Sequence, residues 1–217
     1  MPTMAVQEVV RQTQRLFGDT SEAQIYVQDI IDWINAAQLD IARQTECLQG
    51  IQTINTSTDD PTDGIILPDD FIREKRVVYN NQVLQRTVLE DLDNLRLATT
   101  PSQTDGNPAY YYIWGGSMYL WPDPTNVGAG YYILYYVKSP PQVGASGDIL
   151  SVPFQMYDDV VRFCLMRAKE LNEDEQGVNR ISGELTVKMA QSKDEVQNPT
   201  DSYPSIRDYP GDHWDGG

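Results

Sequence analysis

Two stripes of apolar residues at helical spacing lie near the two ends of this chain, and the long segment between them has the composition of β-strands. A step of three or four residues places apolar side chains on one face of a helix, and that face has to be buried. We therefore expect the helices of the two ends to pack on each other. The stripes consist of Val27, Ile30, Ile31, Ile34, Ala37 and Ile41, and of Tyr157, Val160, Val161, Cys164, Leu165, Ala168 and Leu171.

The helical ends contain four expected helices. The first covers residues 4–17 and stops before a Gly-Asp-Thr break. Ser21 and Gln24 have the spacing of a capping box, which predicts that the next helix runs from about 22 to 46. Pro153 suits the first position of a third helix. A fourth helix carries a weaker stripe made of Val178, Ile181, Leu185 and Met189.

The middle segment is unusually rich in tyrosine. The chain has 13 Tyr, 4 Phe and 1 His, and eight of the tyrosines lie between Tyr110 and Tyr136. Aromatic β-formers on both sides of Gly115-Gly116 predict a hairpin over 110–121, and a further strand follows over 130–137. Asn80-Asn81 indicates a turn between two earlier strands, because Asn tolerates positive φ. The leucines of 89–98 predict a short helix.

These elements define an α+β fold. We expect a helical bundle formed by residues 1–50 and 153–197, with a Tyr-rich antiparallel β region over 51–152 inserted into it. Residues 198–217 contain three prolines and no hydrophobic period, which indicates an extended C-terminal tail.

Charge and composition exclude several partners. Lys and Arg total 16 against 32 Asp and Glu, and the net charge is −16. Phosphates attract basic residues, so general nucleic-acid binding and docking on an anionic membrane are both unfavourable. No apolar run reaches the roughly 18 residues that span a bilayer, and no signal peptide is visible at the N-terminus. Two widely spaced cysteines fit a reducing compartment.

The residues that could carry catalysis or bind a metal favour structural interpretations. His213 lies in the tail without an orienting partner, and Cys47 and Cys164 have the apolar neighbours of cysteines that pack as small hydrophobes. The segment from Asp59 to Asp70 approaches a calcium-loop pattern, but Pro61 occupies a ligand position and the flanking helices are missing. We therefore predict no catalytic residue, no metal and no cofactor.

The aromatic residues of the hairpin form one candidate interface: Tyr112, Trp114, Tyr119 and Trp121. Strand alternation puts about half of such side chains on each face of a sheet. One face would pack inside, and the other would expose Tyr and Trp, which are enriched in protein interfaces. A Tyr-rich sheet core and a surface that stacks on glycans are the alternatives.

The tail carries a second set of candidates: Tyr203, Ile206, Tyr209 and Trp214. Apolar anchors spaced along a Pro-rich segment suit docking into the groove of a partner. The alternative is a disordered end that promotes solubility.

Four segments, taken in order, give the chain a resemblance to a known family. They are DIIDWINAAQLDIARQTE, ILPDDFIREKRVVYN, PAYYYIWGGSMYLWPDPTNVGAGYYILYYVKSPP and LSVPFQMYDDVVRFCLMRAKEL. Together they resemble the head-to-tail adaptor proteins, also called head completion or connector proteins, of tailed bacteriophages. The chain is also similar to the adaptor or tail-tubular proteins of short-tailed phages.

This resemblance implies a structural protein of the virion that is made in the host cytoplasm, is not an enzyme and does not contact a membrane. It implies a homo-oligomeric ring, commonly of twelve subunits, that joins the portal protein to a tail or nozzle protein. The C-terminal segment would grip the portal through the four tail candidates. Double-stranded DNA would pass through the ring without specific binding, since negative walls repel phosphates, and Asp29, Asp32 and Asp40 are candidates to line that channel.

Two other functions remain open on the sequence. The first is a glycan-binding virion module that uses the Tyr/Trp sheet. The second is an enzyme that uses a metal bound at the Asp-rich loop.

Overall fold

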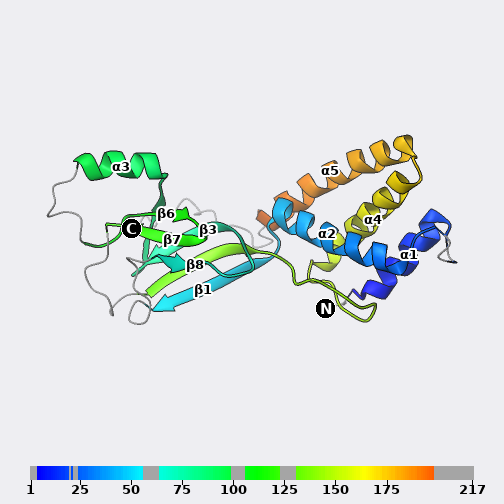
Figure 1. Ribbon diagram of the computed structural model, residues 1–217, viewed down its shortest axis with the longest axis horizontal. Helices are drawn as coiled ribbons and strands as arrows, with labels where there is room; N and C mark the ends of the chain where they lie inside the picture. Colours follow the sequence, from blue (N-terminus) through cyan, green and yellow to red (C-terminus); the bar gives the residue numbers. More distant parts are fainter. Residues whose placement is uncertain are drawn as a thin grey trace, which may run out of the picture.

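The computed structural model describes residues 4–19, 21, 24–55, 64–98, 106–122 and 131–197. Helices α1, α2, α4 and α5 gather at one end of an elongated molecule and the strands at the other, with α3 beyond the strands (Figure 1). This mixture of helices and largely antiparallel sheets confirms the predicted α+β class. In chain order the elements are α1 (Val6–Phe17), α2 (Val27–Thr45), β1 (Gln49–Asn55), β2 (Ile65–Ile66), β3 (Phe71–Tyr79), β4 (Gln82–Val83), β5 (Gln85–Arg86), α3 (Leu89–Ala98), β6 (Tyr110–Trp114), β7 (Ser117–Trp121), β8 (Tyr131–Lys138), the 3-10 turn η3 (Phe154–Met156), α4 (Tyr157–Leu171) and α5 (Glu175–Gln197).

Helices from the two ends of the chain share one hydrophobic core. Val9 of α1, Ile34 of α2, Val160 of α4 and Ile181 of α5 are buried in the same cluster. The two apolar stripes therefore cover each other, as their spacing predicts, except at Leu171, which is 63% exposed at the end of α4. Cys164 is buried in this cluster and Cys47 packs against it, and both are free thiols.

The start of α2 differs from the sequence prediction. The helix begins at Val27 and not near residue 22. The buried carboxylate of Asp19 accepts hydrogen bonds from the backbone N–H groups of Gln24 and Ile25, at 2.7 and 2.9 Å. Since Asp19 satisfies the amides that the predicted capping box would have to satisfy, the helix starts one turn later. Asp29 then accepts a hydrogen bond from the backbone N–H of Tyr26 at 3.3 Å.

Within the residues that the structure describes, the β part contains two four-stranded sheets. Their strand orders are β1-β8-β3-β4 and β2-β7-β6-β5. The chain moves from one sheet to the other at Leu84, which is buried between β4 and β5. Positive φ at Asn80 and Asn81 forms the predicted turn before β4, whereas the pairing of β5 with β6 is parallel.

Side chains of both sheets form a second hydrophobic core. It includes Ile54 of β1, Val77 of β3, Met118 of β7 and Tyr132 of β8. Alternation along β8 buries Leu134 on this inner face and leaves its neighbours half-buried on the other. Part of the Tyr-rich run therefore builds the core, and part lies on outer surfaces.

The helical part and the β part meet at a narrow junction (Figure 1). The chain enters the sheet after α2 and leaves it after β8, and the N–H of Lys138 donates to the carbonyl of Leu48 at 3.0 Å. Glu46 ends α2 with a φ of 59°. Its carboxylate pairs with Arg73, and with Lys75 at 2.9 Å, so that α2 is tied to β3.

The segment that returns from β8 to α4 is held by amide side chains of α2. Asn35 donates to the carbonyl of Val143 at 2.9 Å and accepts from its N–H at 2.8 Å. The side-chain oxygen of Gln38 accepts the N–H of Ser151 at 2.8 Å. These contacts fix the returning segment against the helical core.

Candidate assembly surfaces

The outer face of the β6–β7 hairpin carries an aromatic surface. Gly115 and Gly116 form its turn, both with positive φ, as predicted. Tyr112 and Tyr119 are directly opposite each other, and their rings stack with centroids 5.0 Å apart and planes 14° apart. The indole of Trp114 lies on the same face of β6 and is 64% exposed.

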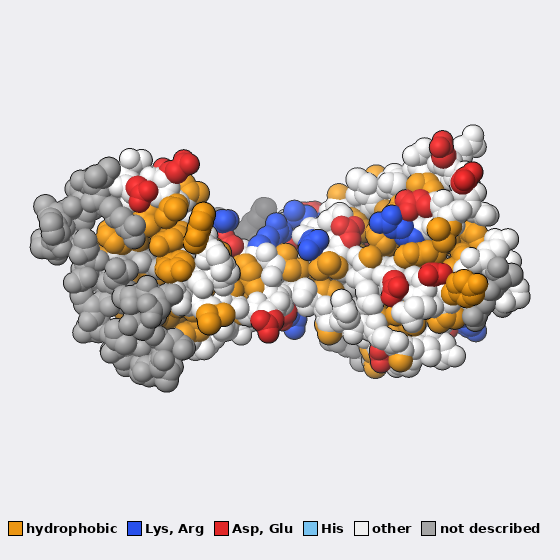
Figure 2. All heavy atoms as spheres, viewed as in Figure 1, with side chains coloured by type: hydrophobic (Ala, Val, Ile, Leu, Met, Phe, Trp, Pro, Cys, Tyr) orange, Lys and Arg blue, Asp and Glu red, His pale blue; other side chains and the backbone are white. Residues whose placement is uncertain are grey.

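Ile66 extends this surface onto β2, where it pairs with Ser117 and is 77% exposed. Hydrophobic side chains gather over the β6–β7 region in the space-filling view (Figure 2). The Tyr119 ring packs closely against Gly64, because a Cβ at this position would lie only 2.8 Å from the ring. We call Tyr112, Trp114, Tyr119 and Ile66 the aromatic face.

Trp121, the fourth aromatic candidate, lies differently. It pairs with Tyr110 across the hairpin and is only 6% exposed. It is therefore not part of the exposed surface. Ile66 had no signal in the sequence that would have assigned it to this face, because its two-residue strand is too short to show alternation.

The three channel candidates lie on α2. All three lie on the side of the helix away from its buried residues. Asp32 and Asp40 follow Asp29 by three and eleven residues, and these separations return to the same side of a helix. Asp32 accepts a hydrogen bond from Gln28 at 3.1 Å, and Asp40 accepts one from Gln44 at 2.9 Å. These contacts are local, so the side chains present negative charge on the outside of the helical part.

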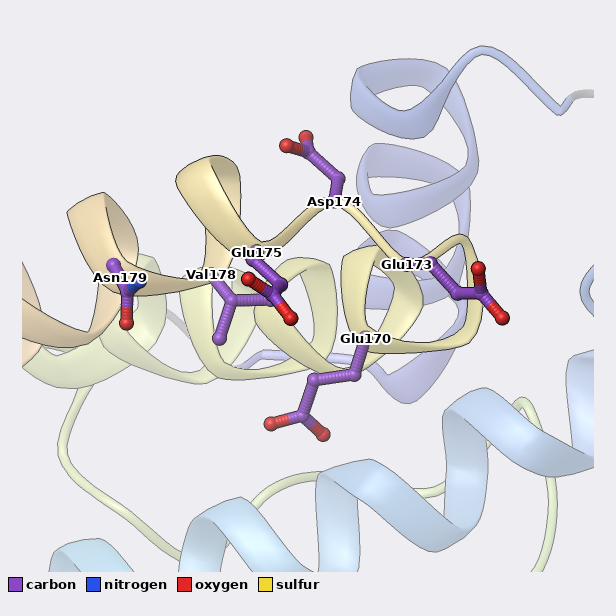
Figure 3. A pocket seen from close by; sticks show the side chains of 6 residues that line it. All are labelled: Glu170, Glu173, Asp174, Glu175, Val178 and Asn179. Atoms are coloured by element: carbon purple, nitrogen blue, oxygen red, sulfur yellow. The ribbon is translucent and has the colours of Figure 1, made fainter.

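The turn between α4 and α5 is a second acidic region, which the sequence analysis missed. Glu170, Glu173, Asp174 and Glu175 line a shallow hollow of about 480 Å³ (Figure 3). Asp174 accepts the backbone N–H of Gly177 at 2.9 Å and pairs with Lys169 at 2.7 Å. The hydrogen bond from Lys169 is the main reason that the pKa of Asp174 is lowered.

The carboxylates of this turn do not converge. The side chains of Glu170, Glu173 and Asp174 point in different directions (Figure 3). Within the described residues, no group of three or more His, Cys, Asp or Glu side chains could hold a metal ion. Asp70, from the calcium-like segment, accepts a hydrogen bond from the Tyr136 hydroxyl at 2.9 Å.

Several candidates fall outside the described residues. They are the tail residues Tyr203, Ile206, Tyr209 and Trp214, together with His213 and the aspartates of the loop at 59–63. The two cysteines are described, and burial raises the pKa of both the Cys47 and the Cys164 thiol. A raised thiol pKa lowers the fraction of reactive thiolate at neutral pH.

No helix in the described part of the chain is long and apolar enough to cross a membrane. The described features are two cores set end to end, an exposed aromatic face and acidic helix surfaces. Exposed aromatic side chains of this kind are typical of surfaces that contact other macromolecules.

Comparison with known families identifies the class more closely. The model of the SU10 adaptor protein family matches residues 4–207. The chain belongs to this family, whose members are bacteriophage head-to-tail adaptor proteins. It is therefore a structural adaptor protein of a phage virion. None of the curated proteins compared with the sequence matches it.

Proposed function

We propose that the protein forms an adaptor ring at the head–tail interface, which joins the portal to the tail and encloses part of the DNA channel. The family match over residues 4–207 is the observation that supports this proposal most directly. The elongated shape, with a helical core at one end and a β core at the other, suits a subunit that contacts a different neighbour at each end (Figure 1). The ring, commonly of twelve copies, acts by assembly and not by catalysis.

The division of the chain suggests how the subunit is oriented. Residues 1–50 and 153–197 make one unit that contacts the portal, and 51–152 make an inserted unit that faces the tail or nozzle protein. Residues 198–217 reach to the portal, with Tyr203, Ile206, Tyr209 and Trp214 as anchors.

The charge of the protein suits a channel for DNA. Each subunit carries a net charge of −16, and the acidic side of α2 offers Asp29, Asp32 and Asp40 to the lumen. Negative walls repel phosphates, so the duplex slides through without specific binding. Changing all three aspartates to Asn should slow DNA ejection from otherwise intact particles. Changing Glu90 and Asp91 of α3, outside the helical part, is the matched control.

Deletion of residues 198–217 tests the proposed attachment. The truncated chain should keep the circular dichroism and melting temperature of the full chain, because the helical core lies within residues 4–196. It should no longer co-sediment with portal rings. A truncated chain that still co-sediments with portal rings contradicts the role of the tail. If electron microscopy of the complex formed by the full chain shows no ring, the proposal itself is contradicted.

The exposure of Trp114 also supports an alternative, in which the aromatic face stacks on glycans. Sugar rings and protein side chains both pack on exposed indoles. Saturable binding on a glycan array that is lost in Trp114→Ala would favour this alternative. Loss of ring or tail assembly in the same variant, without any sugar binding, favours the adaptor ring.

A further inference from the structure

The edge of β1 differs from every other sheet edge among the described residues. Strands β2, β4 and β5, which lie at the remaining edges, have two residues each. Beyond β4, the edge of β3 is interrupted by two register shifts and carries Arg73, Lys75 and Arg76. Short strands, bulges and basic side chains are the devices that keep sheet edges from pairing with other chains.

Strand β1 has none of these devices. It contains seven residues, QGIQTIN, with no charge and no proline, and it pairs with β8 in an uninterrupted register. Ile51 is 65% exposed on it. A long, uncharged edge of this kind is a template for pairing with another strand.

The hydrogen-bond alternation shows which groups are offered at this edge. The N–H of Lys138 donates to the carbonyl of Leu48, so this pair belongs to the hydrogen-bonded set. Every second pair of an antiparallel ladder is hydrogen-bonded through the main chain. The N–H and C=O groups of Gly50, Gln52 and Ile54 therefore also bond to β8. The N–H and C=O groups of Ile51 and Thr53 therefore point to the free edge.

We propose that this edge pairs with the β1 strand of a second copy, antiparallel about a two-fold axis at Gln52. In this register Ile51 of one copy faces Thr53 of the other, and both offer main-chain groups to the shared edge. All seven residues of each strand then overlap. Since β1 carries no charged residue, no like charges face each other across the pair.

An unpartnered amide supports this axis independently. Gln52 pairs with Leu134 on the inner face, and its side-chain oxygen is buried without a hydrogen bond among the described residues. In the proposed pair Gln52 faces Gln52 of the second copy at a position that is not bonded through the main chain, where side chains approach most closely. Each amide can then donate to the oxygen of the other.

The inference concerns the free protein and does not rest on the proposed ring. It predicts a two-fold dimer in solution, weakened by repulsion between chains of net charge −16 and therefore strengthened by salt. Sedimentation velocity of the full chain at roughly 0.5 M salt should show the dimer mass.

Thr53→Pro tests the edge. It removes an N–H that points away from β8, so the ladder within the subunit stays intact, and Thr53→Val retains that N–H as a control. The dimer should be lost in the first variant and kept in the second. A full chain that is monomeric at high salt overturns the proposal, and so does a dimer that survives Thr53→Pro.

A cross-link tests the axis and remains decisive if the proline variant fails to fold. Gln52→Cys, in a Cys47→Ala background, should give a covalent dimer on oxidation, whereas Gln85→Cys on the short strand β5 should not. Equal cross-linking of both variants overturns the proposal. Loss of the dimer on deletion of residues 198–217 also overturns the proposal, because the tail, and not the β1 strand of the second copy, would then hold the dimer together.

Discussion

The carboxylate of Glu46 lies 2.9 Å from the ammonium of Lys75 and also pairs with Arg73. The Glu46 side chain is only 11% exposed, whereas both basic partners are better exposed. One side chain at the end of α2 thus forms ion pairs with two cations of β3 where the helical part meets the sheets. Lys and Arg side chains gather at this junction in Figure 2.

Glu46→Gln should lower the free energy of unfolding by about 2 kcal/mol. It leaves two cations without their counter-ion in a partly buried position, where loss of one partner costs more than at the surface. The control is Glu8→Gln, which breaks the exposed pair with Arg11 and should cost less than about 0.5 kcal/mol. Urea denaturation measures both, and equal effects would contradict the proposed role of Glu46.

The two tryptophans of the hairpin should respond in opposite ways. Trp121→Ala should lower the free energy of unfolding by about 3–5 kcal/mol, because it empties a buried site. Trp114→Ala should change it by less than about 1 kcal/mol, since the indole is exposed, but should impair assembly with tail or neighbouring subunits. Thermal melts and particle reconstitution separate these effects. A strongly destabilised Trp114→Ala protein would show that the aromatic face serves the fold.

Two buried tyrosines of β8 give a matched pair of variants. The hydroxyl of Tyr132 is buried without a hydrogen bond to any described residue, whereas that of Tyr136 donates to Asp70. Tyr132→Phe should leave stability unchanged or raise it by up to about 1 kcal/mol, and Tyr136→Phe should lower it by about 1 kcal/mol. Chemical denaturation at neutral pH gives both values. A large loss in Tyr132→Phe would reveal a partner for its hydroxyl.

Stability should fall at alkaline pH because of Tyr111. Burial, together with the nearby charge of Glu74, raises the pKa of this tyrosine to about 12, above its ordinary value near 10. The folded state then holds the proton more tightly than the unfolded state. The associated stability is present below about pH 10 and is lost as the pH rises toward 12. Tyr111→Phe should flatten this part of the pH profile in urea titrations, and an unchanged profile would assign the loss to other groups.

Much of the architecture followed from local patterns. The short helix predicted over 89–98 forms over Leu89–Ala98, and the turns at Asn80-Asn81 and Gly115-Gly116 form where positive φ is accessible. These features depend on nearby residues only. The predicted start of α2 was wrong. The carboxylate of Asp19, several residues upstream, accepts hydrogen bonds from the backbone amides that the predicted capping box would have satisfied.

The contacts that hold distant segments together could not be predicted. Glu46 and Lys75, and Asn35 and Val143, meet only because the chain folds back, and nothing in their local sequence indicates a partner. The same holds for the aromatic face. Alternation predicted that half of the hairpin aromatics would point outward, but the burial of Trp121 depends on packing that the pattern does not contain.

The hydrogen bond between Lys138 and Leu48 places the entry and the exit of the β part side by side. A segment with adjacent ends can be exchanged as a block, since its replacement changes neither the path nor the spacing of the helices outside it. Replacement of the β part by another sheet unit with adjacent ends should therefore leave the helical part folded.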